Sequence, residues 1–162
     1  VPSILAIGDV IGRVQLTPVA LAEGMAVARR LFRPEEYRKV DYKLIPTAVF
    51  SQPPVGSVGL TERAANDAGI DVVISELDIE VAGSALAREN YSGRAVLVID
   101  RARNVLVGAT FVGPDIAELV HSATVAVVGE VPVERLWHAV PSYPTVSEIW
   151  LRLLENLREE QS

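Results

Sequence analysis

The side chains that most often carry out chemistry are scarce in this sequence. It contains no cysteine and two histidines, His121 and His138. The lack of cysteine excludes a disulfide scaffold, a zinc ribbon and thiol catalysis by these residues. The two histidines lie too far apart for a local metal motif, and no acidic cluster has the spacing of a calcium loop. Binding and catalysis are therefore expected from carboxylates, hydroxyls and the backbone amides at helix starts.

Asp9 is the first candidate for a binding residue. It follows Gly8 directly after the apolar run Ile4–Ile7, which is typical of a strand buried on both faces. Open α/β sheets bind ligands at the carboxyl ends of such strands, where Asp9 would lie. The simpler alternative is an ordinary turn aspartate after a strand.

Thr17 and Pro18 mark the second candidate, the start of a helix. Proline is favoured in the first helical turn, and Val19–Phe32 is a good helix former. The amides at a helix start carry unsatisfied donors and a partial positive charge, so they suit an anionic group. A helix that only caps itself would have the same pattern, and both interpretations can hold together.

Tyr143 and Glu148 form the third candidate, near the end of the chain. A phenol titrates near pKa ~10, so Tyr143 is a poor base at neutral pH, but it can donate a hydrogen bond. An aromatic side chain at a subunit contact is the alternative role for Tyr143. Thr145 to Glu148 fits a capping box, in which the glutamate returns to the amide of Thr145. We favour capping as the main role of Glu148.

Two parts of the chain with different patterns must position these residues. The first part combines the predicted strand Ile4–Ile7 with the predicted helix, which ends at Arg33 because a residue before proline avoids the α conformation. A boundary near Glu36 to Val40 separates it from the second part. There, the predicted strands are 44–50, 55–59, one beginning at 72–74, and 94–100 paired with 105–112 in a hairpin.

Helical patterns dominate the end of the second part. A short helix, Glu62–Ala68, is expected between Thr61 as cap and Gly69 as terminator. Ile116, Leu119, Val120, Ala123 and Val127 lie on one stripe of an amphipathic helix, and Trp150, Leu153, Leu154 and Leu157 form a similar stripe. Strands grouped before helices predict an α+β fold, an antiparallel sheet with helices on one side. We expect the last stripe, with Ile149 beside it, to meet its own copy in a two-fold dimer.

Composition narrows the class of protein. Of the 162 residues 49% are hydrophobic and 22% are charged, which is enough apolar surface for a packed core. The net charge of −6 argues against a nucleic-acid surface. No apolar run approaches the roughly 18–20 residues of a membrane-spanning helix, and the start has no secretion signal, so we expect a soluble, cytoplasmic protein. The first residues enter a core-like run at once, as in a chain whose beginning has been cut away.

Five segments, in chain order, resemble the pyridine nucleotide–disulfide oxidoreductase family of glutathione reductase, dihydrolipoamide dehydrogenase and mercuric reductase. Ile4 to Val10 resembles the family's second flavin motif, a strand that ends in Gly-Asp. The others are 16–20 at the next helix start, 46–62 at the first strand of the dimerisation domain, 113–119 at its Gly-Pro-x-Ala-x-Glu helix, and 143–148 at the terminal His-Pro-Thr-x-x-Glu motif. Each segment alone is a weak signal, but together they cover nearly the whole chain.

This resemblance implies the C-terminal part of a flavoenzyme. Residues 1–38 would end an FAD-binding domain and residues 39–162 would form the dimerisation domain of a homodimer. FAD would be the cofactor, NAD(P)H the co-substrate, and a small molecule the electron acceptor. Asp9 would accept a hydrogen bond from the flavin's ribityl chain. The residues that would present the helix start to the flavin are Leu16, Thr17, Pro18 and Ala20.

The chain departs from the family at the last motif. Tyr143 stands where the family has histidine, and His138 lies five residues out of register. Histidine carries protons between a dithiol and solvent near neutral pH, whereas tyrosine does so poorly. We therefore expect an acceptor such as a quinone rather than a disulfide, and we expect this piece alone to be inactive. The alternative is a stand-alone dimerisation module without flavin.

Overall fold

The computed structural model describes residues 4–160 of the chain. They divide into two compact units, Val1–Ile45 and Pro46–Ser162. Each unit is described by itself below. Among the described residues, no helix is both long enough and apolar enough to cross a membrane.

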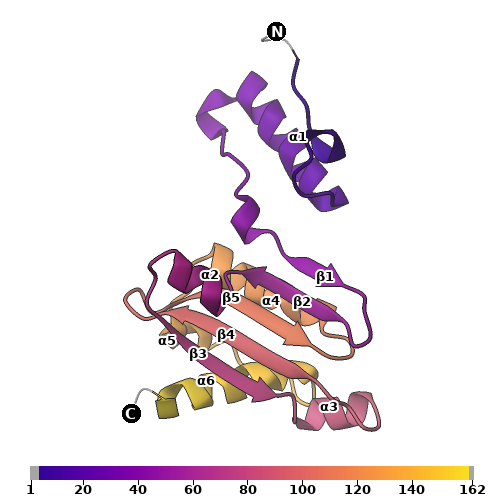
Figure 1. The fold of residues 1–162 in the computed structure, drawn as a ribbon, viewed down its shortest axis with the longest axis vertical. Helices are drawn as coiled ribbons and strands as arrows, with labels where there is room; N and C mark the ends of the chain where they lie inside the picture. The colour runs from indigo at the N-terminus through magenta and orange to yellow at the C-terminus, as the bar shows by residue number, and fades with distance from the viewer. Residues whose placement is uncertain (1–3, 161–162) are drawn as a thin grey trace. The chain divides into compact units, whose positions relative to one another are not determined.

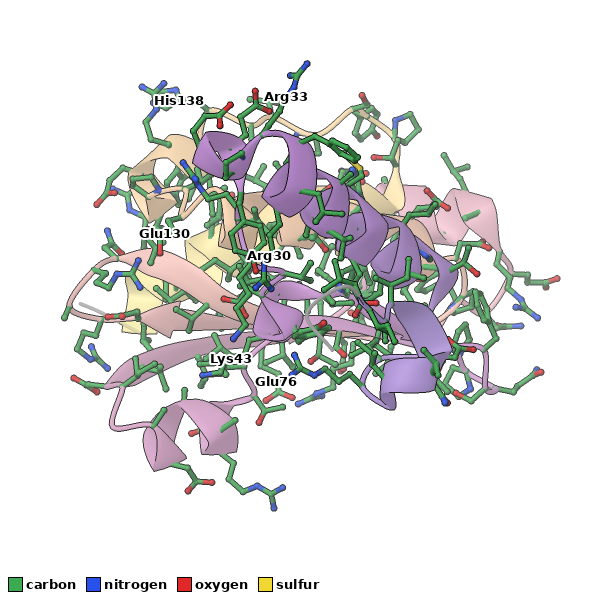
Figure 2. The ribbon with its side chains drawn as sticks, turned by 90° about the horizontal axis from the view of Figure 1, so that it is seen from above. Arg30, Arg33, Lys43, Glu76, Glu130 and His138 are labelled. Atoms are coloured by element: carbon green, nitrogen blue, oxygen red, sulfur yellow. The ribbon has the colours of Figure 1, made fainter. Side chains whose placement is uncertain are left out.

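The first unit is built around one long helix, α1 (Thr17–Phe32), as the sequence predicts. Pro18 lies in its first turn, and Arg33 ends it before Pro34. Arg30 and Arg33 lie near the C-terminal end of α1, where positive side chains oppose the negative end of the helix dipole (Figure 2). One short 3₁₀ helix precedes α1 in the chain, η1 (Gly8–Ile11), and two follow it, η2 (Pro34–Glu36) and η3 (Tyr42–Leu44).

The strand predicted for Ile4–Ile7 is wrong. This segment is extended but unpaired, and Ile4 is 73% and Ile7 40% exposed. A strand needs a neighbour to take up its backbone hydrogen bonds, and the described part of this unit contains no other strand. The 3₁₀ helix η1 follows the segment, so Asp9 lies in a helical turn rather than at the end of a strand.

The second unit contains a five-stranded sheet that is antiparallel throughout, in the order β1-β2-β5-β4-β3 (Figure 1). Its strands are β1 (Thr47–Val49), β2 (Val55–Gly59), β3 (Val72–Asp78), β4 (Arg94–Asp100) and β5 (Val105–Val112). The hairpin of β4 and β5 has the predicted bounds. Its turn is held by Asp100, whose Oδ1 accepts from the amides of Ala102 and Arg103 at 2.9 and 3.0 Å. The strand predicted over 44–50 is limited to β1, because η3 takes up Leu44.

The helices expected at 62–68, along the Ile116–Val127 stripe and along the Trp150–Leu157 stripe are present, and the antiparallel sheet with these helices confirms the α+β class. Two helices lie between strands, one after β2 and one after β3, and the helices at 82–87 and 133–136 are additional to those expected. The helices are α2 (Glu62–Asp67), α3 (Ala82–Ala87), α4 (Ala117–Val128), α5 (Val133–Leu136), η4 (Val146–Glu148) and α6 (Ile149–Glu160). Thr61 caps α2 by accepting from the amide of Ala64 at 3.2 Å. Helices α4 and α6 cover one face of the sheet (Figure 1), since the paired residues Gly56 and Phe111 contact α4 and α6 respectively.

The apolar stripe of α6 lies in the core of its own unit. Leu153 and Leu157 are 0% and 2% exposed, and the ring of Trp150 lies 5.9 Å from that of Phe111. The hydroxyl of Ser75 on β3 donates to the carbonyl of Leu153 at 2.7 Å. The predicted dimer surface on this stripe is therefore wrong, because the stripe covers β3 and β4 within the chain. Amphipathicity shows that a helix face is buried, but it does not identify what buries it.

Candidate functional site

The turn that carries Asp9 is fixed to helix α1. Gly8 has φ +72°, and a side chain there would meet the Cβ of Ala20 at 3.3 Å. The amide of Gly8 donates to Oε2 of Glu23 at 2.6 Å. Asp9 itself is exposed. The backbone next to Asp9 is thus fixed to α1, and Asp9 itself is exposed to solvent.

Glu23 is a residue whose role the sequence reasoning missed. It is only 5% exposed, and its Oε1 accepts from the hydroxyl of Tyr42 at 2.6 Å. This hydrogen bond, and then that from the Gly8 amide, hold the pKa of Glu23 below its ordinary value. The same bond raises the pKa of Tyr42, whose ring also lies under the guanidinium of Arg13 at 4.9 Å. The sequence did contain a signal for this role. Glu23 lies four residues after Val19 and so on the same, buried face of the helix, where a carboxylate needs hydrogen-bond donors.

The start of α1 is open to solvent. Leu16, Thr17 and Pro18 are exposed, and the carbonyl of Leu16 accepts from the amides of Val19 and Ala20 at 3.0 and 3.1 Å. No side chain caps the helix at Leu16. The predicted flavin-binding residues thus lie together in one unit, with the turn of Asp9 beside Ala20 and an exposed positive helix end.

Tyr143 and Glu148 lie in the second unit, on the segment that leads into α6. Tyr143 is 77% exposed. Thr145 donates from Oγ1 to the carbonyl of Ser142 at 2.6 Å, which closes a tight turn around Tyr143. The phenol is therefore displayed on an ordered turn and is available to a partner or a small molecule.

Glu148 does not form the predicted capping box. Its Oε2 accepts from the amide of Gly83 at 3.1 Å, and Thr145 provides no side-chain cap to η4. The physical reason is competition: η4 is a single 3₁₀ turn, and the amide of Gly83 in the first turn of α3 lies within reach. Glu148 therefore does accept from an amide at a helix start, but this amide belongs to α3 and not to its own helical turn, η4.

The candidate residues are divided between the two units. Asp9 and α1 belong to the first unit, and Tyr143 and Glu148 to the second. His121 and His138 are both exposed. Among the residues that the structure describes, no group of three or more His, Cys, Asp or Glu is placed to hold a metal ion.

Comparison with known proteins identifies the class to which this fold belongs. The family model described as "Pyridine nucleotide-disulphide oxidoreductase, dimerisation domain" matches residues 45–153. The chain therefore belongs to the pyridine nucleotide–disulphide oxidoreductase family. This confirms the resemblance carried by the sequence motifs.

Individual relatives agree with this assignment. The chain is 32% identical over 150 residues to dihydrolipoyl dehydrogenase of Chlamydia trachomatis, covering 93% of this chain and 32% of that protein. It is 38% identical over 148 residues to the chloroplastic/mitochondrial glutathione reductase of Pisum sativum, covering 91% and 27%. The solved structure of the HOCl-induced flavoprotein disulfide reductase RclA from Escherichia coli matches with a TM-score of 0.83 at 26% identity, covering 94% of this chain and 35% of that one. The chain thus spans about a third of the length of these relatives.

Proposed function

We propose that this chain is the C-terminal part of an FAD-dependent NAD(P)H oxidoreductase, and that it supplies the homodimer contact and part of the flavin and acceptor sites. The family and the names of the relatives support an oxidoreductase. The exposed residues of both candidate sites fall in the motifs that match the family. Residues 1–38 would then end the FAD-binding domain, and residues 39–162 would form the dimerisation domain of a cytoplasmic enzyme.

The first unit suits one edge of FAD. Asp9 offers an exposed carboxylate to a hydroxyl of the ribityl chain, and the exposed start of α1 at Leu16, Thr17 and Pro18 offers a positive helix end to an anionic ring edge. The side chain of Ala20 is small and Gly8 has none, so the turn of Asp9 can approach the helix closely at this point. When bound, FAD would accept a hydride from NAD(P)H and pass the electrons to the acceptor.

The observation that carries the acceptor proposal is the exposed Tyr143 on its ordered turn, at the position of the family's histidine. A neutral phenol donates a hydrogen bond to an oxygen that gains negative charge, but it is a weak carrier of protons to a dithiol at neutral pH. An acceptor with a carbonyl-type oxygen, such as a quinone, fits Tyr143 better than a disulfide.

The substitution Tyr143→Phe in the full-length enzyme tests this proposal. Flavin reduction by NAD(P)H should stay nearly unchanged, and reoxidation by a soluble naphthoquinone should slow by about 10-fold, as expected for the loss of one hydrogen bond. Stopped-flow absorbance separates the two half-reactions, and Tyr91→Phe provides a control tyrosine whose hydroxyl bonds the carbonyl of Pro114 instead. Unchanged reoxidation in Tyr143→Phe, or efficient turnover of a disulfide by the wild type, would make Tyr143 a packing residue.

The homodimer contact is proposed on α4 and the segment after α5. The apolar side chains left exposed there are Val125 (56%), Val128 (55%) and Val140 (81%). A hollow of about 420 Å³ is lined by residues of α4, of the segment after α5 and of α6, among them Ala126, Val140 and Trp150. An apolar surface of this kind around a hollow suits an isologous contact with a second copy. A stand-alone dimerisation module would use the same surface but would need neither Asp9 nor the open start of α1.

A further inference from the structure

Helix α3 packs against the backbone that carries Tyr143. Gly83, in its first turn, is buried, and a Cβ at this position would overlap the carbonyl group and the Cα of Thr145. The backbone of Gly83 needs no positive φ, so glycine is required here for close approach alone. The position of α3 therefore determines where the backbone lies two residues after Tyr143.

A hydrogen bond fixes the same contact from the other side. Oε2 of Glu148 accepts from the amide of Gly83 at 3.1 Å, across 65 residues of sequence. The next two amides of α3, those of Ser84 and Ala85, donate to the carbonyl of Val81 at 3.1 and 3.2 Å. The turn of Tyr143 is thus held at Thr145 by packing and at Glu148 by a hydrogen bond to the Gly83 amide.

We infer that Gly83 and Glu148 are positioning residues for Tyr143, and that α3 sets the place from which the phenol meets the acceptor. This inference rests on the proposed role of Tyr143. Glu148 acts here as an acceptor for a backbone amide, so the contact needs its oxygen atom and not its negative charge. A glutamate that served proton transfer or charge pairing would need the carboxylate itself.

The pair Glu148→Gln and Glu148→Ala separates these roles. Glutamine keeps an acceptor oxygen and loses the charge, whereas alanine loses both. Hydrogen–deuterium exchange on the full chain reports the protection of the Gly83 amide without any cofactor. We expect protection to fall by about 10-fold or more in Glu148→Ala and to stay near the wild-type value in Glu148→Gln. Glu130→Ala is the matched control, because Glu130 is exposed and accepts from Arg103, so its loss should leave Gly83 protected.

The flavin-loaded full-length enzyme provides the second readout. Reoxidation by a soluble naphthoquinone should slow in Glu148→Ala and in Gly83→Ala, with flavin reduction unchanged, and Glu148→Gln should restore the wild-type rate. Equal loss of protection in Glu148→Gln and Glu148→Ala, or a Gly83 amide that is equally unprotected in the wild type, would overturn the inference. Failure of the proposed function gives a different result: Tyr143→Phe would leave reoxidation unchanged while the exchange pattern of Gly83 stayed as expected. Circular dichroism of each variant shows whether Gly83→Ala still folds, and the Glu148 pair decides the question if it does not.

Discussion

At the scale of single residues, two glutamates support the candidate sites in the same way, by accepting a hydrogen bond from a backbone amide. Glu23 accepts from the amide of Gly8 at 2.6 Å, and Glu148 accepts from that of Gly83 at 3.1 Å. Each carboxylate satisfies a backbone donor of a turn that is distant in sequence and so fixes that turn to a helix. For Glu23, the hydrogen bonds from Tyr42 and then from the Gly8 amide lower its pKa, so they favour its ionised form and the geometry beside Asp9 should depend on the charge of Glu23.

The hydrogen bonds of Glu23 predict a pH dependence for the first unit. Because its pKa is lowered in the folded chain, the stabilisation that Glu23 contributes is fully present above the ordinary value of 4.5 and is lost as the pH falls through the lowered value. The protection factor of the Gly8 amide, measured by hydrogen exchange between neutral pH and pH ~3, should therefore fall on the acid side. Glu23→Gln should remove this pH dependence, and the exposed Glu35→Gln should keep it. An identical acid transition in Glu23→Gln would show that another group is responsible.

At the scale of elements, an aromatic contact between strand β5 and helix α6 forms part of the core of the second unit. The side chain of Phe111 is 0% exposed and lies between Ala95 and Gly56 on the neighbouring strands. Its ring meets that of Trp150 at a centroid distance of 5.9 Å. Because α6 also carries the turn of Tyr143 at its start, the core beneath it positions the candidate site.

Removing this ring should destabilise the second unit. Phe111→Ala is expected to lower the free energy of unfolding by about 3–5 kcal/mol, through lost burial and the cavity that remains. Phe50→Ala is the control, because Phe50 is 83% exposed, and a change within about 0.5 kcal/mol is expected there. Urea denaturation followed by circular dichroism measures both. Equal effects of the two substitutions would contradict the packing described for Phe111.

The proposed dimer contact on helix α4 can be tested by placing a charge in it. Val125→Asp would bring two like charges into a two-fold contact, which is unfavourable by several kcal/mol, so the dimer should dissociate at micromolar concentration. Leu86→Asp on α3, at a side chain that is 73% exposed, is the control and should leave the dimer intact. Sedimentation velocity distinguishes the two masses. A wild-type chain that sediments as a monomer would contradict the dimer, and a Val125→Asp chain that stays dimeric would place the contact elsewhere.

Local sequence patterns predicted most helices and strands, but they failed where the structure of a segment depends on a partner that is distant in the sequence. The hairpin of β4 and β5 and helix α1 were predictable, because alternation, turn residues and proline act over a few positions. The strand prediction for Ile4–Ile7 was wrong because a strand needs a neighbouring strand, which a local pattern does not reveal. The partner of Glu148 lies 65 residues away, and no local spacing indicates it. Asp9, Thr17 and Tyr143 could be selected as exposed candidates from motifs, whereas the buried support from Glu23 required the structure.

At the scale of the whole molecule, the proposed function gives this chain only part of an FAD site. The chain spans about a third of the length of its relatives, and in the proposal its first unit would offer Asp9 and the start of α1 to the ribityl chain and the ring edge. The pyrophosphate of a dinucleotide is bound by a glycine-rich turn between a strand and a helix. In this sequence no two glycines are spaced as the start of Gly-x-Gly-x-x-Gly requires. The groups that contribute most to binding the phosphates are therefore missing from the 162 residues.

The chain by itself should consequently bind FAD weakly or not at all. Titration of FAD with the chain, followed by flavin fluorescence, should give a dissociation constant well above the micromolar range, because the ribityl and ring contacts alone leave both phosphates in solvent. Asp9→Ala in the full-length enzyme is the complementary measurement. It should weaken FAD binding by about 10-fold, the effect of one hydrogen bond to a charged group, without changing the oligomeric state. Riboflavin, which lacks the phosphates, is the control ligand: the isolated chain should hardly distinguish it from FAD, whereas the full-length enzyme should prefer FAD strongly. Submicromolar binding of FAD by the isolated chain would mean that these residues hold a phosphate site of their own, and the assignment of the chain as a partial flavin site would be wrong.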